Sequence, residues 1–567
     1  MTKERAGAYI SKLVFNNDEE LEINKNDIVV FVGPNNVGKS QSLKDIRNLA
    51  YNSQYLFSKV VKSITLSQLS GNIIELIDTL RFKSGTDAVF LGQHVYLDGF
   101  NINNTEKHSI NLYKTLYQLL ICEISTARRL NSCGPVDNIN NDEEPNDVIQ
   151  YIINKPECQD WLSLSYKKAF GVPLIVNKYD GRQISLRIGN EVSSDDVKKK
   201  VDSDDMLKLT SAYTTILESY DKVNEQGDGI KSFVGILLYL AIEHYCTFLI
   251  DEPESFLHPP QARIMGQIIG EKLDDSQQAF ISTHSEDIIK GLIDVAPERV
   301  KIIRITRNET ENSFLVLENE RLKEIWSDPL LKYSNIMSCL FHNKVIICES
   351  DSDCKMYSFI ENALLREKEH YSETLFIHCG GKDRVGKIAR ALKALDIDVR
   401  VILDIDVLNA EQSFKSVVEA MGMDWASIEQ AYNILVKAIK NKKKSLDKQT
   451  FKENITNLLE KNTDRCVSDE DIKQIRSLLK SNSPWNEVKE NGKSAIPSGD
   501  ASERYEQLDS ILKMNSIFLV PVGELECFIK SVGGHGPNWV TNVIEKYPDV
   551  NDSVYKSIKE FVSEVIT

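Results

Sequence analysis

The apolar residues of this chain follow two patterns, one typical of strands and one typical of helices, and together they predict a mixed α/β protein. Short runs of β-branched and aromatic residues, such as IVVFV at 28–32 and TFLI at 247–250, predict buried strands. Longer runs with an apolar period of about 3.6 residues predict helices between them. From about 50 to 220 the pattern is mainly helical, except at 173–189, where two β-rich runs around Asp180-Gly181 predict a hairpin.

The first strand leads into a glycine-rich turn, GPNNVGKS, that matches GxxxxGK[ST] at every fixed position. A strand before the turn and a helical pattern after it are the context of a phosphate-binding loop, and they disfavour a chance match. Backbone amides and the positive end of the helix hold phosphates, the lysine reaches the β- and γ-phosphates, and the serine binds Mg²⁺. The residues expected to bind ATP here are Gly33, Asn36, Gly38, Lys39 and Ser40.

Two later strands carry the partners that such a loop needs. TFLIDE ends in Asp251, expected to help hold Mg²⁺, and Glu252, expected to act as the general base that polarises the attacking water. The next strand, AFISTH, ends in His284, which is suited to sense the γ-phosphate. The order of these motifs predicts an ATPase rather than a nucleotide-binding loop alone.

A second glycine-rich turn, EQGDGIKSF, precedes the apolar helical run VGILLYLAI. An ABC-type ATPase needs a signature loop at this point of the chain, whose amides contact ATP held by a partner protomer. Gly227 and Gly229 are the candidates, although the turn departs from the usual LSGGQ pattern. A plain helix-capping turn is the alternative, and it would not require dimerisation through the heads.

Carboxylates follow three strands in the second half of the chain. The runs KVIIC, VRVIL and IFLV each lead into acidic residues, and parallel strands would gather these at one edge of a sheet. Clustered carboxylates repel one another unless cations neutralise them, and oxygen ligands suit Mg²⁺ or Mn²⁺. The expected metal ligands are Glu349, Asp353, Asp404, Asp406, Glu524 and Glu526.

In this order the motifs GPNNVGKS, IDEPESFLHP, ISTHS, ESDSD, DID and GELE resemble the OLD (overcoming lysogenization defect) family. The resemblance spans nearly the whole chain. It implies an ABC-type ATPase followed by a Toprim nuclease domain, with metal-dependent cleavage or nicking of DNA at Glu349, Asp404 and Asp406. It further implies a homodimer or larger oligomer through the heads, a role in phage defence and, for some members, a retron or another partner.

The resemblance also leaves two positions open. Ser350 stands where the family has glycine after the first glutamate, so this loop is expected to be slightly displaced. Family members use a lysine near the C-terminus to stabilise charge on the phosphate. Lys530 is the nearest candidate for that role, and His535 in the loop GGHGPNW is the alternative.

These readings give an α/β fold in two parts. We expect an ABC-type ATPase head over 1–50 and 170–335, with a helical insertion at 50–170 as a possible dimerisation arm. A Toprim nuclease domain is expected over 336–567, with its own helical insertion at about 410–510. A length of 567 residues fits about three or four folding units.

Composition narrows the possible partners. A formal net charge of -16 argues against a protein that coats nucleic acid over its whole surface. The 10 cysteines are scattered without CxxC pairs, and no signal peptide or membrane span is expected, so the prediction is a cytoplasmic protein without a membrane partner. A basic run could meet DNA phosphates or simply be a solvated helix face. That run contains Lys437, Lys440, Lys442, Lys443 and Lys444.

Two other functions use the same parts. An ATP-gated DNA clamp or sensor of the SMC or RecF kind would carry a Toprim domain that no longer cuts, but the three intact acidic sets oppose it. A topoisomerase would need a tyrosine-bearing cleavage domain, and the sequence offers no candidate for one.

Overall fold

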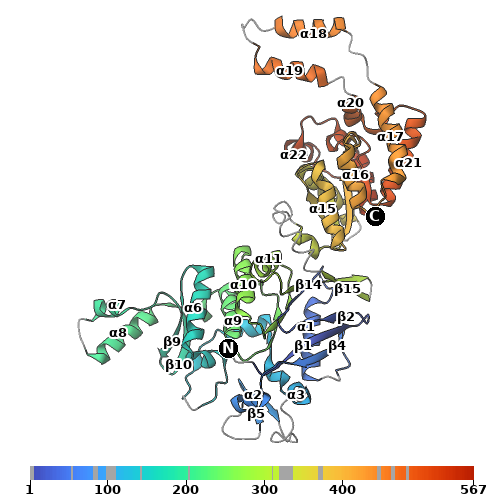
Figure 1. Cartoon of the computed structure of the whole chain (residues 1–567). Coiled ribbons are helices and arrows are strands. Elements are labelled where there is room, and N and C mark those ends of the chain that lie inside the picture. The colour runs from blue at the N-terminus through green and yellow to red at the C-terminus, as the bar shows by residue number, and fades with distance from the viewer. Residues whose placement is uncertain are drawn as a thin grey trace. The chain divides into compact units, whose positions relative to one another are not determined.

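The computed structural model divides the chain into two compact units, residues 1–324 and 325–567 (Figure 1). It describes residues 5–52, 55–80, 87–96, 110–140, 143–201, 205–308, 311–317, 336–367, 374–442, 448–460, 467–480 and 484–567. Within these ranges every helix is too short or too polar to pass through a bilayer.

The first unit is built on a six-stranded sheet of order β15-β14-β3-β13-β12-β7, in which all neighbours are parallel except β14 and β15. The central strands are apolar and buried along their whole length, as expected of a parallel sheet that is covered on both faces. The strands are β3 (Ile28–Val32), β7 (Ile121–Ile124), β12 (Thr247–Asp251), β13 (Gln278–Ser282), β14 (Val300–Asn308) and β15 (Glu311–Leu317).

A smaller antiparallel sheet packs beside the central one. Its order is β2-β1-β4, and Phe15 of β1 stacks on Phe314 of β15 with ring centroids 4.0 Å apart. Helix α1 shares the hydrophobic core formed with this sheet. The bounds are β1 (Ala8–Phe15), β2 (Glu20–Glu22), β4 (Val61–Gln68) and α1 (Lys39–Tyr51).

Further helices and a four-stranded sheet complete this unit (Figure 1). The predicted hairpin is present, since β9 (Leu174–Asp180) pairs with β10 (Gln183–Ile188) in antiparallel register. Strands β8 (Val136–Asp137) and β11 (Asp221–Lys222) flank β10. The helices are α5 (Val148–Ile153), α6 (Pro156–Phe170), α7 (Ser194–Lys200), α8 (Met206–Glu218), α9 (Asp228–Leu240), α10 (Pro259–Lys272) and α11 (Glu286–Val295).

The segment 50–170 differs from the expected helical insertion. It contains α2 (Ile73–Leu80), α3 (Ile110–Leu120) and α4 (Thr126–Asn131), but also the strands β4, β5 (Asp87–Phe90), β6 (Gln93–Tyr96), β7 and β8. Pairing of β4 with β1 and of β7 with β12 supplies main-chain hydrogen bonds that local helical spacing does not reveal. The central sheet and the β2-β1-β4 sheet of the first unit therefore each take a strand from this stretch.

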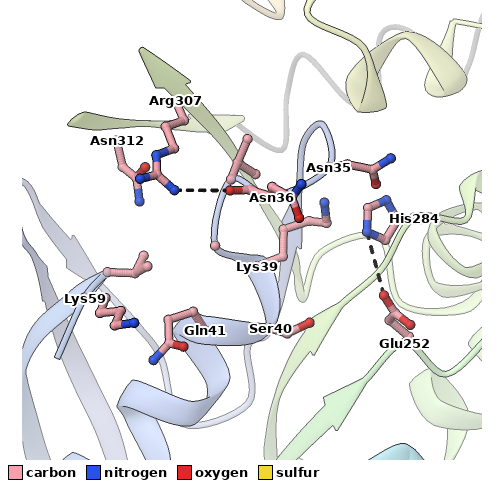
Figure 2. Close-up of a pocket in the computed structure, with 13 residues that line it drawn as sticks. Asn35, Asn36, Lys39, Ser40, Gln41, Lys59, Glu252, His284, Arg307 and Asn312 are labelled. Carbon is pink, nitrogen blue, oxygen red and sulfur yellow. Dashed lines mark hydrogen bonds and ion pairs between the residues drawn. The ribbon is translucent and has the colours of Figure 1, made fainter. Parts of the chain in front are cut away.

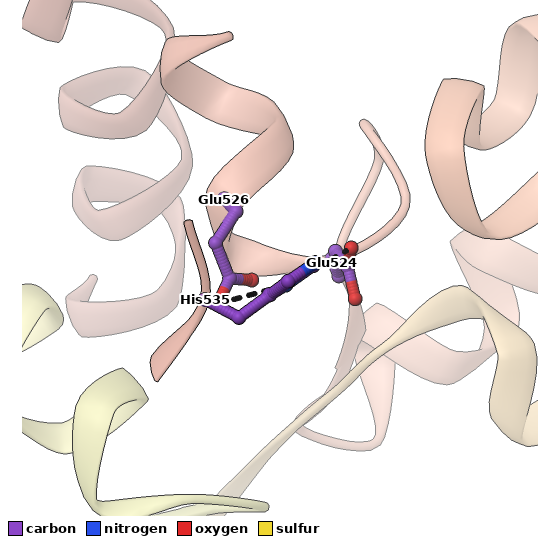
Figure 3. A group of neighbouring side chains, drawn as sticks. All are labelled: Glu524, Glu526 and His535. Atoms are coloured by element: carbon purple, nitrogen blue, oxygen red, sulfur yellow. Dashed lines mark ion pairs between the residues drawn. The ribbon is translucent and has the colours of Figure 1, made fainter. Parts of the chain in front are cut away.

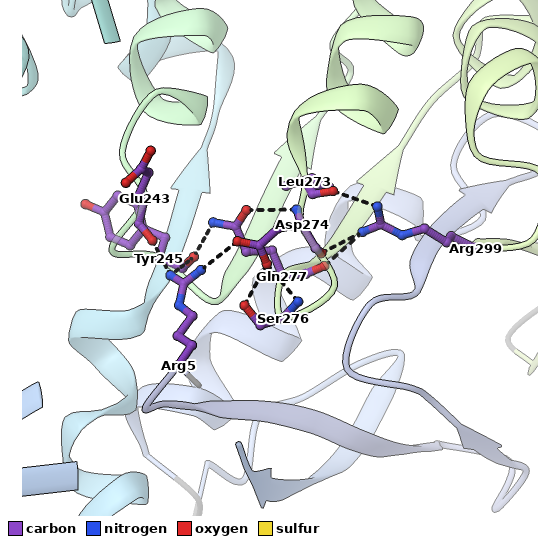
Figure 4. Close-up of polar contacts among 8 residues, drawn as sticks. All are labelled: Arg5, Glu243, Tyr245, Leu273, Asp274, Ser276, Gln277 and Arg299. Carbon is purple, nitrogen blue, oxygen red and sulfur yellow. Dashed lines mark hydrogen bonds and ion pairs between the residues drawn. The ribbon is translucent and has the colours of Figure 1, made fainter. Parts of the chain in front are cut away.

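Two arginines fasten the loops at the edge of the central sheet where β3 and β13 begin (Figure 4). Arg5 donates to the carbonyl of Tyr245 at 2.8 Å. Arg299 donates to the carbonyls of Asn26 at 2.8 Å and of Leu273 at 2.6 Å. Charged donors that satisfy several loop carbonyls stabilise turns that the sheet itself cannot pair.

The second unit is built on a four-stranded parallel sheet of order β17-β16-β18-β19. The strands are β16 (Lys344–Cys348), β17 (Thr374–His378), β18 (Asp398–Leu403) and β19 (Ile517–Leu519). A core that includes the fully buried Trp539 packs on this sheet. Its helices are α14 (Asp351–Glu367), α15 (Lys382–Ala394), α22 (Gly536–Lys546) and α23 (Lys556–Ile566).

The chain between β18 and β19 is a long excursion made of helices. These are α16 (Glu411–Ala420), α17 (Ala426–Asn441), α18 (Lys448–Glu460), α19 (Asp469–Lys480), α20 (Pro484–Asn491) and α21 (Asp500–Met514). Helix α17 packs on α21 and α20, and α21 in turn contacts β19 of the sheet.

Candidate active sites

The glycine-rich turn joins β3 to α1 in the way a phosphate-binding loop requires. Gly33 has φ 141° and Gly38 has φ 104°, a region that other residues rarely adopt. A Cβ on Gly33 would lie 2.1 Å from the carbonyl oxygen of Ile305, so β14 approaches the turn closely. Both glycines are therefore required by the backbone as well as by the motif.

Lys39 is held in the cradle by the turn itself. Its Nζ donates to the carbonyl oxygens of Gly33 at 2.8 Å and Pro34 at 2.6 Å. Burial lowers the pKa of Lys39 to about 8, and the nearby carboxylates of Glu252 and Glu254 oppose this shift. A bound phosphate would favour the charged ammonium, so the site is arranged to receive an anion.

The loop opens into a cavity of about 770 Å³ (Figure 2). Lys39 and Ser40 lie between Glu252 and His284 on one side and Lys59, Arg307 and Asn312 on the other. The sequence did not single out the last three, because they lie outside any motif: Lys59 is just before β4, Arg307 is on β14 and Asn312 is on β15. The full lining is Asn35, Asn36, Val37, Gly38, Lys39, Ser40, Gln41, Lys59, Val60, Glu252, His284, Arg307 and Asn312.

The two carboxylates after β12 occupy different positions. Asp251 accepts a hydrogen bond from the Ser282 hydroxyl and does not line the cavity, whereas Glu252 does. Glu252 has φ 45°, and its amide donates to the carbonyl of Ser282 at 2.9 Å. A left-handed conformation at a residue other than glycine costs about 1–3 kcal/mol and needs support from its surroundings.

His284 lies opposite Glu252. Its Nε2 is 3.7 Å from Glu252 Oε1, and its amide donates to Glu254 Oε1 at 2.6 Å. Burial lowers the pKa of His284, and Lys39 adds to this effect. A neutral imidazole beside Glu252 can donate to a phosphate or a water, as a residue that senses the γ-phosphate must.

The candidate signature glycines lie apart from the cavity. Gly227 is the N-cap of α9, and Gly229 lies in the first turn of this helix. A Cβ on Gly229 would lie 2.7 Å from the carbonyl oxygen of Phe256, so the helix start is packed against the turn after Glu252. Contact of these glycines with a partner's ATP stays a prediction.

The second unit holds a cavity of about 550 Å³ at the carboxyl ends of its strands. Glu349 follows β16, Asp353 lies in α14 and Asp404 follows β18, while Glu524 and Glu526 follow β19. All five line this cavity. The sheet thus brings together carboxylates that are far apart in the chain, at the edge where α/β folds place their sites.

Burial makes these carboxylates costly to ionise. It raises the pKa of Glu349 to about 7, raises the pKa of Asp353 and raises the pKa of Asp404 well above its usual value. The Asp404 amide donates to Glu349 Oε1 at 3.1 Å. Buried oxygen ligands that resist ionisation fit a divalent cation such as Mg²⁺ or Mn²⁺, which would restore the charged forms.

Two lysines that sequence reasoning missed lie beside this cavity. Lys489 Nζ is 3.1 Å from Glu524 Oε2, and Lys382 Nζ is 3.5 Å from Asp406 Oδ2. Asp406 does not line the cavity. Lys382 follows a Gly-Gly turn after β17, a strand that the sequence analysis did not predict. This turn is the sequence feature that could have drawn attention to Lys382. Lys489 lies in α20, where nothing in the sequence marked it.

Of the two C-terminal candidates for a phosphate-stabilising residue, only His535 lies near the carboxylates. Lys530 does not line the cavity and donates instead to the Glu490 carbonyl at 2.8 Å. His535 Nδ1 is 3.6 Å from Glu526 Oε1 and 3.9 Å from Glu524 Oε1 (Figure 3). Ligand atoms of this group lie within 4.8 Å of one another, which suits one metal ion.

The basic run at the end of α17 is divided between two roles. Lys437 and Lys440 are exposed and offer charge to solvent or phosphate. Lys442 is paired with Glu487 at 3.0 Å and donates to the Ala495 carbonyl. Lys443 and Lys444 lie outside the described residues.

Comparisons with known proteins match this geometry. Residues 340–406, which contain β16, β18 and the carboxylates that follow these strands, match the family model "Overcoming lysogenization defect protein-like, TOPRIM domain". The Old nuclease of Escherichia phage P2 is 22% identical over 166 residues, which are 28% of this chain and 28% of that protein. The OLD nuclease of Thermus scotoductus is 28% identical over 200 residues, which are 32% of this chain and 36% of that protein.

Residues 340–406 are therefore a TOPRIM domain of the kind found in overcoming lysogenization defect protein-like proteins. Because the aligned segments span only 28% and 36% of these relatives, the comparisons support the Toprim domain and a likeness to OLD nucleases, but not the whole activity. The chain is also similar to the SMC head domain of Thermotoga maritima (12% identity, TM-score 0.29, 55% of this chain and 99% of that one). The chain is likewise similar to cbiO1 of Clostridium perfringens (13% identity, TM-score 0.27, 58% of this chain and 94% of that one).

The fold class follows from the chain's own strand order and motifs. An ABC-type P-loop ATPase head contains β3, the glycine-rich turn and α1, and a Toprim domain contains the parallel sheet of the second unit.

Proposed function

We propose that this chain is an ATP-regulated, Mg²⁺- or Mn²⁺-dependent DNA endonuclease or nickase that acts in defence against phage. The observation that carries the proposal is the convergence of six carboxylates, the five described above and Asp351, on one cavity; they come from three strand ends and one helix. The names of the phage P2 and Thermus scotoductus relatives support a nuclease.

The carboxylates would hold the metal, and the metal would supply electrostatic stabilisation to a phosphodiester during cleavage. Glu349, Asp353, Asp404, Glu524 and Glu526 are the proposed ligands. Lys489 offsets part of their negative charge, so that a phosphate anion can approach the site. Lys489 thereby takes the role for which Lys530 was the first candidate.

The nucleotide cavity would provide regulation. Lys39 and the loop amides would bind the phosphates of ATP, Ser40 and Asp251 would hold its Mg²⁺, and Glu252 would act as the general base. The proposed partners are DNA and a second copy of this chain, which would present Gly227 and Gly229 to the bound ATP.

Nicking of supercoiled plasmid tests this function. The purified chain should convert the plasmid to open-circular or linear DNA with Mg²⁺ or Mn²⁺, and not with EDTA. ATP, ADP and a non-hydrolysable ATP analogue added in parallel show whether the nucleotide promotes or restrains cleavage. If plasmid is bound in an ATP-dependent manner but never cut with either metal, the chain is an ATP-gated DNA clamp instead.

A further inference from the structure

Among the described residues of the first unit, Arg129 is the largest charged side chain that is completely buried, with 0% of its surface exposed. It lies in α4, a short helix that directly follows β7 at the edge of the central sheet. Burial of a guanidinium is costly unless its donors are used, so its partners show what the residue is for.

The partners are the main-chain oxygens of the two acidic residues after β12. One terminal nitrogen of Arg129 donates to the carbonyl of Asp251 at 2.7 Å, and the other donates to the carbonyl of Glu252 at 2.8 Å. A planar guanidinium can hold two successive carbonyls at once, which a lysine ammonium cannot do with the same geometry. These two bonds fix the peptide that carries Glu252.

Glu252 needs such support, because its φ is 45° and its side chain has to face the nucleotide cavity. The Nε atom of Arg129 has no hydrogen-bond partner among the described residues, so the side chain serves these carbonyls and little else. The carboxylates of Glu254, Asp251 and Glu252 favour the charged guanidinium and partly offset its burial.

The main chain of Arg129 also contacts α9, the helix that begins at the candidate signature turn. A Cβ on Gly235 of α9 would lie 2.2 Å from the carbonyl oxygen of Arg129. Nearer the start of α9, the Ser232 hydroxyl donates to the carbonyl of Ser255 at 3.1 Å. Helix α9 is therefore packed directly against α4 and hydrogen-bonded to the turn that follows Glu252.

We propose that Arg129 is a positioning residue for ATP hydrolysis, which holds Glu252 against the nucleotide cavity and couples it to α9. The inference rests on the ATPase part of the proposed function. Arg129 does not touch the nucleotide cavity, so its loss should slow turnover and leave ATP binding intact.

The test compares Arg129→Lys with Arg128→Lys in the full chain. Arg128 is the adjacent residue of α4 and donates to the Glu123 carbonyl at 2.8 Å and the Tyr239 hydroxyl at 3.0 Å, away from Glu252. We expect Arg129→Lys to lower kcat for ATP by about tenfold to a hundredfold, with KM and the affinity for a fluorescent ATP analogue unchanged. Arg128→Lys should keep the wild-type kcat.

Two further variants separate positioning from a general loss of structure. Gly235→Ala should lower kcat in the same way, because its Cβ displaces α4 without touching the nucleotide. In a Glu252→Gln background, Arg129→Lys should cause no further loss, since both changes act through one group.

Each outcome decides a different question. Wild-type protein that binds ATP but does not hydrolyse it contradicts the proposed ATPase and the role of Arg129 with it. If the wild-type protein hydrolyses ATP and Arg129→Lys and Gly235→Ala do so at the same rate, the inference about Arg129 is overturned while the proposed ATPase stands. A fall in kcat that is equal in Arg128→Lys, or additive with Glu252→Gln, also overturns it, since that pattern belongs to a merely structural residue.

Discussion

The nucleotide cavity takes its phosphate-binding groups from one contiguous stretch, whereas the carboxylate cavity takes its ligands from positions between 349 and 526. The first is rich in donors and holds a lysine whose pKa is lowered, so it is prepared for an anion. The second buries carboxylates whose pKa values are raised, so it is prepared for a cation. Opposite charges in the two cavities mean that separate substitutions should remove separate activities.

The largest effect should come from the carboxylates. Glu349→Ala or Asp404→Ala removes a proposed metal ligand, so DNA cleavage should fall by about a hundredfold or more while ATP hydrolysis stays near the wild-type rate. Plasmid nicking and phosphate release measured on the same preparation check this. Asp398→Ala, at the opposite end of β18 from Asp404, is the matched control and should cleave normally. Cleavage at the wild-type rate by both ligand variants would show that the cut is made elsewhere.

Substitutions in the nucleotide cavity, the one that Lys39 and Ser40 line, should affect ATP binding and hydrolysis. Lys39→Ala removes the cation held by Gly33 and Pro34, so ATP binding should be lost. Glu252→Gln should bind ATP normally but hydrolyse it about a hundredfold more slowly, because the general base is gone. Equilibrium binding and single-turnover hydrolysis distinguish the two steps. Wild-type turnover in Glu252→Gln would remove the general-base assignment.

A smaller effect is expected from His535. If its imidazole joins Glu524 and Glu526 around one ion, His535→Ala should weaken Mn²⁺ binding by about tenfold and abolish the nitrogen hyperfine signal of bound Mn²⁺ in electron paramagnetic resonance. His378→Ala is the control, because His378 lines the cavity that Glu524 and Glu526 also line but is not part of this group. A nitrogen signal that persists in His535→Ala, or disappears in His378→Ala, contradicts the assignment.

The smallest effect concerns pH and the first unit alone. Burial lowers the pKa of His244, which packs on Phe90 with ring centroids 4.0 Å apart, to about 3. The unfolded chain protonates at a higher pH than the folded one, so stability is complete above the unfolded pKa and is lost as pH falls. This group should contribute a loss of about 1.4 kcal/mol per pH unit below pH about 6.5.

Denaturant unfolding of the first unit between pH 7 and pH 5 measures this slope. His244→Phe should reduce the slope of the free energy of unfolding with pH by the amount that corresponds to the uptake of about one proton. His94→Gln, a change at an exposed histidine, should leave the slope unchanged. An unchanged slope in His244→Phe would mean that other groups cause the acid sensitivity.

Local and nonlocal features explain what the sequence could predict. The glycine-rich turn between β3 and α1, the carboxylates after β12 and the hairpin of β9 and β10 each follow from contiguous residues, so residue spacing sufficed to find them. Parallel strands with acidic ends also predicted which carboxylates would meet, with the exception of Asp406.

The parts that were missed depend on pairing between distant segments. Strand β7 continues directly from α3, and only its hydrogen bonds with β12 make it a strand. Arg129 and Lys489 carry no motif, and their roles depend on which carbonyls and carboxylates the fold places within reach. Charge and composition contain no information on such contacts.

The helical excursion between β18 and β19 has a consequence for synthesis of the chain. The central sheet of the first unit is complete once β15 has left the ribosome, whereas Glu524 and Glu526 emerge only after the whole excursion. At the usual rates of translation, the growing chain spends many seconds with its first unit able to fold and its metal ligands incomplete. Under the proposed function, a newly made copy would therefore meet ATP before it is able to cut DNA.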